Sequence, residues 1–263
     1  MAKVLAISSH VVRGCVGLAA TVPALRHLGH EVWALPTVLL ASRPGLGRLV
    51  KREVAPADLA DMLSALAADG CWASIDAVLA GYFASPEAVA AAAQAVAAIK
   101  AARPDAAVLV DPVLGDAGRL YVSEATAAAI RDLMLPLATI ATPNAFELGW
   151  LTGTAPRTFE ETAAAARRLG PATVVVTSAR ETDAGVATVL VAGDTCLERQ
   201  SMRLAGLPNG AGDLFAGLLL GHLADGLAAG SALDASLAVL DRVLAASAGR
   251  DSLQLAALAG RPA

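Results

Sequence analysis

The chain has 263 residues, a net charge of −4, 56% hydrophobic residues and only 17% charged residues. At roughly 100–200 residues per domain, this length fits one large domain or two small ones, and the hydrophobic fraction excludes a disordered chain. A nucleic-acid surface needs clustered basic residues, and the nearest candidate cluster contains no aromatic residue: Arg43, Arg48, Lys51 and Arg52. We therefore expect no nucleic-acid partner.

The cysteines and the apolar runs indicate the cellular compartment. Cys15, Cys71 and Cys196 lie far apart and form no Cys-x-x-Cys pair, which fits neither a disulfide framework nor a zinc site. No uncharged apolar run reaches the length of about 18 residues that a transmembrane helix needs. Polar residues 8–10 and Arg13 interrupt the apolar region that a signal peptide requires. We expect a cytoplasmic protein without membrane contact.

Short apolar runs alternate with longer helical patterns along the first two thirds of the chain. The runs typical of buried strands cover residues 3–8, 31–35, 76–80, 107–111, 139–142 and 173–177. The helical patterns between them cover residues 17–28, 57–67, 86–102, 124–133 and 160–169. In the last third, a predicted hairpin (186–192 and 195–203) precedes two helices (211–227 and 233–248) and a final helical turn (253–258).

This alternation predicts an α/β fold. Strands separated by helices favour a doubly wound, mostly parallel central sheet with helices on both faces. We find no linker rich in Gly, Ser or Pro and no internal repeat, so residues 1–263 are interpreted as a single domain.

A glycine-rich turn with an aspartate opens the first of the two C-terminal helices. Gly210 and Gly212 leave backbone N–H groups free to face a ligand, and a helix N-terminus suits a phosphate group. Asp213 places a carboxylate beside that anion site, where it can take a proton from an attacking hydroxyl group. The alternative is an ordinary helix start with an acid favourable to the helix dipole. Neither a Walker A sequence nor a GxGxxG after the first strand is present.

Two acidic segments, DPVLGD and TPNAFE, each follow a predicted strand. Open α/β sheets bind ligands at the carboxyl ends of their strands. Asp111 and Asp116 can hold a cation or order water around Mg²⁺, and Asn144 and Glu147 can share one face of a helix start. The alternatives are a carboxylate that accepts backbone hydrogen bonds and a helix N-cap with a capping-box acid. Tyr82, after another strand, either stacks on a flat ligand or closes the core.

With these motifs in this order, the chain resembles the ribokinase-like superfamily and, within it, the pyridoxal kinases. The superfamily motifs are a Gly-x-Gly-Asp turn, here residues 210–213, and an Asn-x-x-Glu, here residues 144–147. The segments that point to pyridoxal kinases are residues 9–17 (SHVVRGCVG), 81–82, 111–116, 118–122 and 142–147. They occur in the family's order and spacing over nearly the whole chain.

The resemblance implies a three-layer ribokinase-like fold without a separate lid domain, and ATP-dependent phosphorylation of the 5′-hydroxyl group of pyridoxal, pyridoxine or pyridoxamine. It implies that Asp213 is the base and that Ser9 and Tyr82 contact the pyridine ring. The backbone N–H groups that would form the anion hole belong to Gly210, Ala211 and Gly212.

The resemblance also implies cofactors and an assembly. Asp116 and Glu147 would lie near Mg²⁺, and Asp111 and Thr142 near a monovalent cation, K⁺ or Na⁺. The residues expected around ATP are Asn144, Thr177, Ser178, Asn209, Gly210 and Gly212. A homodimer is expected.

One loop departs from the family pattern. Where the family often has Gln-Phe-Ser-Asn-His-Thr, residues 39–44 read LLASRP, so the histidine and threonine that contact substrate are absent. Arg43 is a candidate replacement for one contact. The vitamer preference therefore stays open. The alternatives are a hydroxymethylpyrimidine or other small-molecule kinase of the same superfamily, such as a sugar kinase, and a non-catalytic ligand-binding protein on the same fold.

Overall fold

The computed structural model describes residues 1–182 and 185–259. Its main sheet has the strand order β11-β10-β9-β8-β5-β4-β1-β2-β3. The bounds are β1 (Lys3–Arg13), β2 (Glu31–Ser42), β3 (Lys51–Glu53), β4 (Ala77–Ala80), β5 (Ala107–Val110), β8 (Ile140–Ala141), β9 (Thr173–Thr182), β10 (Gly185–Ala192) and β11 (Thr195–Ser201). Two short strands, β6 (Gly115–Asp116) and β7 (Arg119–Leu120), form a separate ribbon. Strands β2, β1, β4, β5, β8 and β9 run parallel, whereas β3, β10 and β11 are antiparallel to their neighbours.

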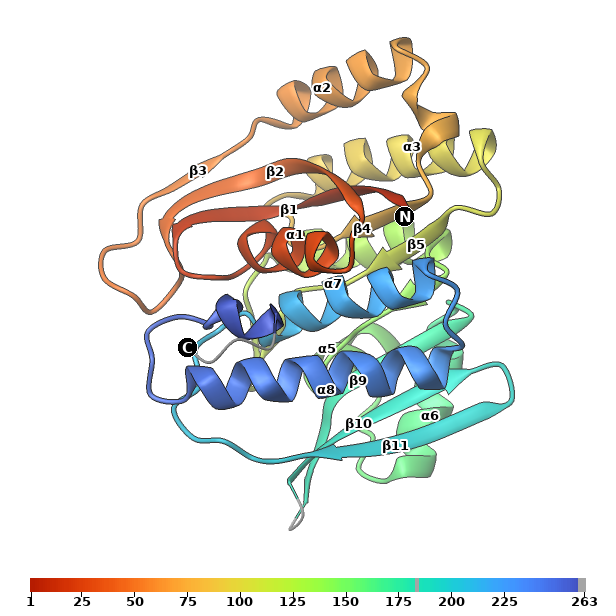
Figure 1. Ribbon diagram of the computed structural model, residues 1–263. Helices are drawn as coiled ribbons and strands as arrows, with labels where there is room; N and C mark the ends of the chain where they lie inside the picture. The colour runs from red at the N-terminus through yellow and green to blue at the C-terminus, as the bar shows by residue number, and fades with distance from the viewer. Residues whose placement is uncertain (183–184, 260–263) are drawn as a thin grey trace.

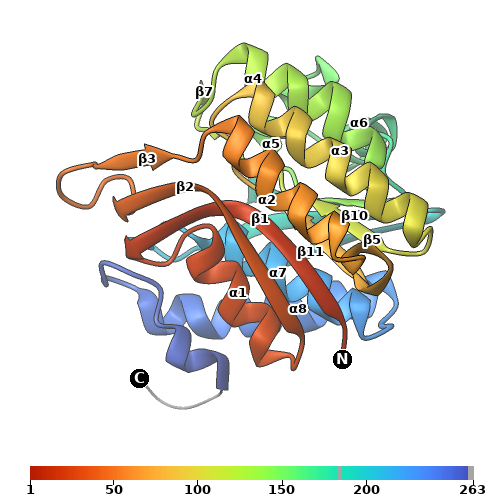
Figure 2. The same cartoon turned by 90° about the horizontal axis from the view of Figure 1, so that it is seen from above.

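Helices cover both faces of this sheet (Figures 1 and 2). They are α1 (Leu18–His27), α2 (Pro56–Ala68), α3 (Pro86–Ala102), α4 (Glu124–Ala129), α5 (Ala145–Thr152), α6 (Phe159–Arg168), α7 (Ala211–Ala224) and α8 (Ala229–Ser247). Shorter helical turns occupy Cys71–Ser74, Ile130–Met134, Leu135–Leu137 and Leu255–Ala259. In the described ranges, no helix is both long and apolar enough to cross a membrane.

The alternation of side chains along the central strands builds two separate cores. In β1, Leu5 and Ile7 pack with residues of α2 to α6, while Val4 and Ala6 pack with residues of α1, α7 and α8. Each core thus joins one face of the sheet to one helical layer, as successive side chains of a strand point to opposite faces. The predicted three-layer, mostly parallel α/β fold is confirmed.

Two strands run further than the sequence pattern predicts. β1 continues past residue 8 to Arg13, and β2 continues past residue 35 to Ser42, where it pairs with β3. The β1 pairing shifts register between Ser8 and His10, which marks a bulge. Residues 10–13 of β1, 38–42 of β2 and 51–53 of β3 thus continue the sheet beyond the predicted strands. The expectation of short strands was wrong here because polar residues break the apolar run at the bulge.

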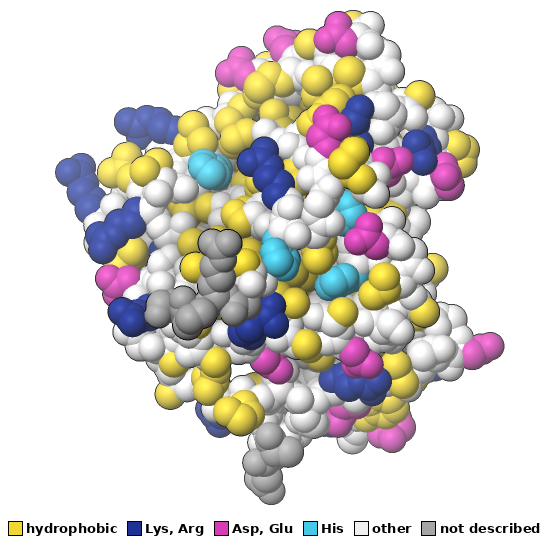
Figure 3. All heavy atoms as spheres, in the orientation of Figure 1, with side chains coloured by type: hydrophobic (Ala, Val, Ile, Leu, Met, Phe, Trp, Pro, Cys, Tyr) yellow, Lys and Arg dark blue, Asp and Glu magenta, His cyan; other side chains and the backbone are white. Residues whose placement is uncertain are grey.

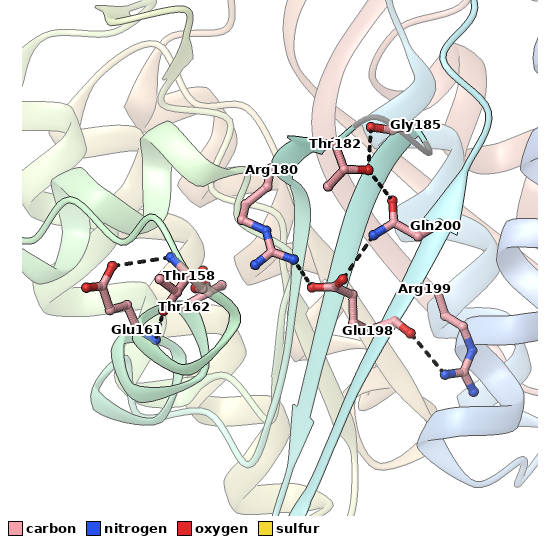
Figure 4. Close-up of polar contacts among 9 residues, drawn as sticks. All are labelled: Thr158, Glu161, Thr162, Arg180, Thr182, Gly185, Glu198, Arg199 and Gln200. Atoms are coloured by element: carbon pink, nitrogen blue, oxygen red, sulfur yellow. Dashed lines mark hydrogen bonds and ion pairs between the residues drawn. The ribbon is translucent and has the colours of Figure 1, made fainter.

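The hairpin predicted in the last third is present, and β9 extends to meet it. Arg180 of β9 pairs with Glu198 of β11, and Thr182 Oγ1 donates to Gln200 Oε1 over 2.9 Å (Figure 4). β9 runs on to Thr182 rather than ending at residue 177, with a register shift beside Ser178, whose φ is 47°. The polar contacts of Arg180 and Thr182 join β9 to β11 across β10, and Ser178 is exposed within β9 at the register shift.

Candidate active site

Most of the predicted site residues follow the carboxyl ends of neighbouring parallel strands. Ser9 lies at the bulge of β1, Tyr82 after β4, Asp111 after β5, Thr142 after β8, and Thr177 near the middle of β9. Because these strands are parallel and adjacent, their carboxyl ends meet at one edge of the sheet, where ligands bind in open α/β folds. The structure therefore brings these predicted residues to one edge.

The glycine turn has a backbone that only glycine can adopt. Gly210 caps α7 with φ 112° and ψ 0°, and a Cβ there would lie 1.8 Å from the carbonyl oxygen of Cys15. The start of α7 thus packs directly on the loop between β1 and α1. Gly217 permits a similar approach further along α7, since a Cβ there would lie 3.0 Å from Thr21 O. Close packing of α1 on α7 fixes the position of the helix N-terminus.

Asp213 lies in the first turn of α7, half-buried beside the β1–α1 loop. Burial raises the pKa of its carboxyl group to about 6, and the backbone N–H of Gly17 opposes this rise. Gly17 has φ 57°, and a Cβ there would lie 2.2 Å from Ser9 O. The sequence did not reveal the contact between Gly17 and Asp213, although Gly17 is the last residue of the segment 9–17.

Burial shifts the pKa values of three carboxyl groups in this part of the site. Burial raises the pKa of Asp111 well above its ordinary range, and the charges of Glu147 and Asp213 raise it further. Burial also raises the pKa of Glu147, to about 7, against the effect of its backbone N–H donors. Among the residues described, none of the three forms an ion pair with a basic side chain. The cluster carries excess negative charge when it is ionised.

Thr142 lies beside this cluster. Its hydroxyl group lowers the pKa of the neighbouring Asp111, but within residues 1–182 and 185–259 the buried Thr142 Oγ1 forms no well-aligned hydrogen bond. In the same part of the chain, no three His, Cys, Asp or Glu side chains are arranged to hold a metal ion by themselves. A cation here would need further oxygen ligands from water or from a phosphate, as Mg²⁺ commonly has.

Asn144 and Glu147 form the capping box that the sequence left open as an alternative. Asn144 Oδ1 accepts from Glu147 N over 2.9 Å, and Glu147 Oε2 accepts from Asn144 N over 2.9 Å. Glu147 Oε1 accepts from Leu114 N over 2.8 Å, and Asn144 Nδ2 donates to Gly115 O over 2.8 Å. These bonds join the start of α5 to the loop that carries Asp116, which is exposed and accepts from the next residue's N–H.

The backbone of Tyr82 is held on both sides. Ser8 Oγ accepts from Tyr82 N over 3.0 Å, and Thr37 Oγ1 donates to Tyr82 O over 2.7 Å. A Cβ on Gly81 would lie 2.5 Å from Ser8 Oγ, so the preceding position requires glycine. Ser9 is buried and Tyr82 is half-buried, and both lie at the same end of the sheet.

The remaining predicted ATP ligands lie at the border of the candidate site, and we call them the rim residues: Thr177, Ser178 and Asn209. Thr177 N donates to Pro143 O over 2.9 Å, which holds β9 next to the Asn144 loop. Ser178 and Asn209 are exposed, and Asn209 Nδ2 approaches Pro44 O at 3.5 Å. The β2–β3 loop therefore reaches the glycine turn.

The side chain of Arg43 is held by other parts of the chain. Its Nε donates to Asp251 O over 2.9 Å and its Nη1 to Pro44 O over 3.1 Å, while its side chain packs on Gly14. The C-terminal segment thus binds part of the Arg43 guanidinium group, and the suggestion that Arg43 replaces one substrate contact stays a prediction. Figure 3 shows Lys and Arg side chains gathered at the side of the molecule where the β2–β3 loop lies.

Comparison with known proteins identifies the family. The family model described as phosphomethylpyrimidine kinase matches residues 14–256. A protein of Leifsonia xyli named pyridoxal kinase is 39% identical over 227 residues, which cover 84% of this chain and 80% of that protein. One of Granulibacter bethesdensis with the same name is 36% identical over 271 residues, covering 98% and 94%. The chain belongs to the pyridoxal kinase family.

Solved structures of pyridoxal kinases share the whole fold. The enzyme from Entamoeba histolytica matches with a TM-score of 0.90 and 25% identity, covering 99% of this chain and 95% of that one. The Leishmania donovani pyridoxal kinase in complex with ADP and pyridoxine matches with a TM-score of 0.87 and 28% identity, covering 99% and 96%. The predicted family and its ribokinase-like fold are thus confirmed.

Proposed function

We propose that this protein transfers the γ-phosphoryl group of ATP to the 5′-hydroxyl group of pyridoxal and related B6 vitamers. The observation that carries this proposal is the position of Asp213. Its carboxyl group stands in the first turn of α7, next to a glycine turn that has no side-chain cap within the described residues, at the edge of the sheet that also holds Ser9 and Tyr82. Family membership supports the same reaction.

The chemistry follows from these positions. Ser9 and Tyr82 orient the pyridine ring so that the 5′-hydroxyl group faces Asp213. The hydroxyl oxygen forms a bond to the γ-phosphorus, the bond to the β,γ-bridging oxygen breaks, and ADP leaves. The carboxylate of Asp213 accepts the hydroxyl proton. The N–H groups of residues 210–212 donate to the oxygens of the transferred group, where negative charge must be stabilised.

The acidic cluster fits cations. Burial raises the pKa values of Asp111, Glu147 and Asp213, and Thr142 Oγ1 is a buried oxygen with no well-aligned partner in the described residues. We propose that Asp111 and Thr142 hold a monovalent cation, K⁺ or Na⁺, and that Asp116 and Glu147 lie near Mg²⁺, with water between. When bound, Mg²⁺ neutralises phosphate charge.

The rim residues would hold ATP. We propose contacts from Thr177, Ser178 and Asn209 with the phosphates, in addition to the N–H groups of Gly210 and Gly212. Asn144 would act mainly by holding the neighbouring loop, because both ends of its amide group are already bonded. We further propose that residues 1–263 act as a single domain in the cytoplasm and, from the resemblance, as a homodimer.

The activity should fall in acid through protonation of Asp213. Its pKa of about 6 means that the base is ionised above pH 6 and protonated below it. We therefore expect kcat at saturating MgATP to fall about tenfold per pH unit below pH 6. The pH profile of the Asp213→Glu variant is the control, because this substitution shifts the acid limb of the profile only if the carboxyl group of residue 213 causes that limb. A wild-type profile that is flat from pH 8 to pH 5 would contradict the assignment.

Cations should stabilise the protein more at pH 8 than at pH 6. The pKa values of Asp111 and Glu147 are raised in the folded state, so the stability that their protonation contributes is lost as the pH rises toward and past about 7. A bound cation offsets this loss. We expect MgCl₂ with KCl to raise Tm by about 3–5 °C at pH 8 and by less at pH 6. Choline chloride at equal ionic strength is the control, and an equal effect of choline would contradict a specific site.

The function is tested by ADP release with MgATP and four acceptors: pyridoxal, pyridoxine, pyridoxamine and hydroxymethylpyrimidine. The proposal predicts turnover with at least one B6 vitamer. The family model's description makes hydroxymethylpyrimidine the informative competitor. Turnover with that acceptor alone would replace the substrate while leaving the kinase chemistry. ADP release with none of the four, in K⁺ and in Na⁺ buffers, would refute the proposed function.

A further inference from the structure

Two buried hydroxyl groups hold the main chain of Tyr82. Thr37 Oγ1 donates to Tyr82 O over 2.7 Å, and Ser8 Oγ accepts from Tyr82 N over 3.0 Å. The main-chain bonds between β1 and the segment after β4 run as far as Gly81 N, which donates to Ile7 O over 2.9 Å. Tyr82 is therefore fixed by two side chains at the point where the strand pairing ends.

The bulge between β1 and β2 brings Thr37 to this position. β1 lies between β2 and β4 in the sheet, so a contact from β2 to the segment after β4 must pass β1. Between the residues of β2 that pair with Ser8 and His10, two residues of β2 stand opposite the single residue Ser9, and Thr37 is one of the two. A bulge redirects side chains and interrupts the regular ladder. Thr37 thus lies opposite Ser9 and in contact with Tyr82, the two residues proposed to hold the pyridine ring.

The two hydroxyl groups can act on a ligand only through Tyr82. Thr37 and Ser8 are 2% and 1% exposed, so a ligand that enters from solvent meets the half-buried tyrosine and not the hydroxyls. Apolar packing is non-directional, whereas hydrogen bonds set distances and angles. The hydroxyls therefore fix the main chain from which the tyrosine ring projects. The ring itself packs against an apolar cluster formed by Val11, Val38 and Leu40.

We propose that Thr37 and Ser8 are positioning residues that hold Tyr82 in place for the vitamer. This proposal rests on the proposed function, in which Tyr82 contacts the pyridine ring. A binding side chain must be held within about 0.5 Å of its productive position, and the residues behind it supply that precision. Asp213 and the glycine turn are held instead by the loop between β1 and α1. Loss of either hydroxyl therefore weakens vitamer binding and leaves ATP binding and phosphoryl transfer unchanged.

The test removes each hydroxyl and measures the vitamer and ATP parameters separately. Thr37→Val keeps the shape of the side chain and removes the donor. The KM of pyridoxal, and its Kd measured by calorimetry without ATP, are expected to rise about fivefold. Ser8→Ala is expected to raise both about threefold. In both variants, kcat at saturating pyridoxal and the KM of MgATP should stay within about twofold of the wild type. Thr37→Ser keeps the donor and should retain the wild-type KM of pyridoxal.

Two controls separate positioning from a general loss of stability. Thr162 is 1% exposed, and its Oγ1 donates to Thr158 O over 2.7 Å within α6, which carries none of the predicted site residues. Thr162→Val should leave the KM of pyridoxal unchanged. In a Tyr82→Ala protein the ring is absent, so the addition of Thr37→Val should raise the Kd of pyridoxal no further. Thermal unfolding curves verify that each variant folds, and Ser8→Ala tests the same claim if Thr37→Val unfolds.

The outcomes distinguish the positioning role from the function on which it rests. Wild-type turnover of B6 vitamers, with an unchanged KM and Kd of pyridoxal in Thr37→Val and Ser8→Ala, overturns the positioning role alone. An equal effect of Thr37→Val with and without the tyrosine ring assigns Thr37 a structural role and also overturns it. A fall in kcat together with a rise in the KM of MgATP has the same meaning. No turnover of any vitamer by the wild type overturns the proposed function and the positioning role together.

Discussion

Replacing Asp213 by asparagine is expected to lower kcat by about 10³-fold with little change in stability. Asparagine has nearly the same shape and keeps an oxygen that can accept the Gly17 N–H, but it cannot take the proton of the acceptor hydroxyl. The KM of the vitamer should change little, because the pyridine contacts come from other residues. The measurement is steady-state ADP release with pyridoxal at pH 8, where the wild-type carboxyl group is ionised.

The control for this variant lies at the other end of the same helix. Asp225 caps the C-terminus of α7, away from the glycine turn, and Asp225→Asn should keep wild-type kcat. Binding of ATP to the Asp213→Asn protein, measured by calorimetry, should remain within a few-fold of the wild type. A turnover near that of the wild type would remove Asp213 from the role of base.

Gly210→Ala is expected to lower activity strongly and to destabilise the fold. The new Cβ would stand 1.8 Å from the carbonyl oxygen of Cys15, and a φ of 112° strains any residue with a Cβ. Relief of the clash must move the start of α7 away from the β1–α1 loop, and the N–H groups that face the phosphates move with it. We expect kcat/KM to fall at least about 10²-fold and the free energy of unfolding to fall by about 3 kcal/mol.

Gly226→Ala separates backbone strain from the clash. Gly226 also has a positive φ, 86°, but a Cβ there meets nothing within 4 Å. This variant should lose about 1 kcal/mol of stability and retain full activity. Chemical denaturation and ADP release, measured on both variants, test the difference. Equal effects of the two substitutions would show that the contact with Cys15 is unimportant.

The parts of the fold that could be predicted depend on strong local patterns. The alternation of strands and helices could be predicted, because the strands contain apolar runs and several helices, such as α3, contain long alanine-rich stretches. The glycine turn at Gly210 could also be predicted from local sequence. Glycine just before a helix usually adopts a positive φ or allows a close approach of another backbone. The same local pattern placed Asp213 beside the turn, and the family resemblance then implied its role as base.

The missed parts depend on contacts between distant segments. The extension of β1 past Ser8 follows a bulge and is stabilised by pairing with β2, and neither can be read from the local sequence. The side chain of Arg43 is held by a carbonyl more than 200 residues later in the chain. Glu147 shows a second limit of sequence-based prediction, because the pattern Asn-x-x-Glu fits both a capping box and a cation site. The structure shows the capping box directly.

The most direct test of the central claim is identification of the product. The protein is incubated with MgATP, KCl and pyridoxal, and the mixture is separated by chromatography with mass detection. The account predicts pyridoxal 5′-phosphate in an amount equal to the ADP formed, with wild-type protein and not with Asp213→Asn. ADP formation without a phosphorylated vitamer, or equal product from the Asp213→Asn protein, would contradict it.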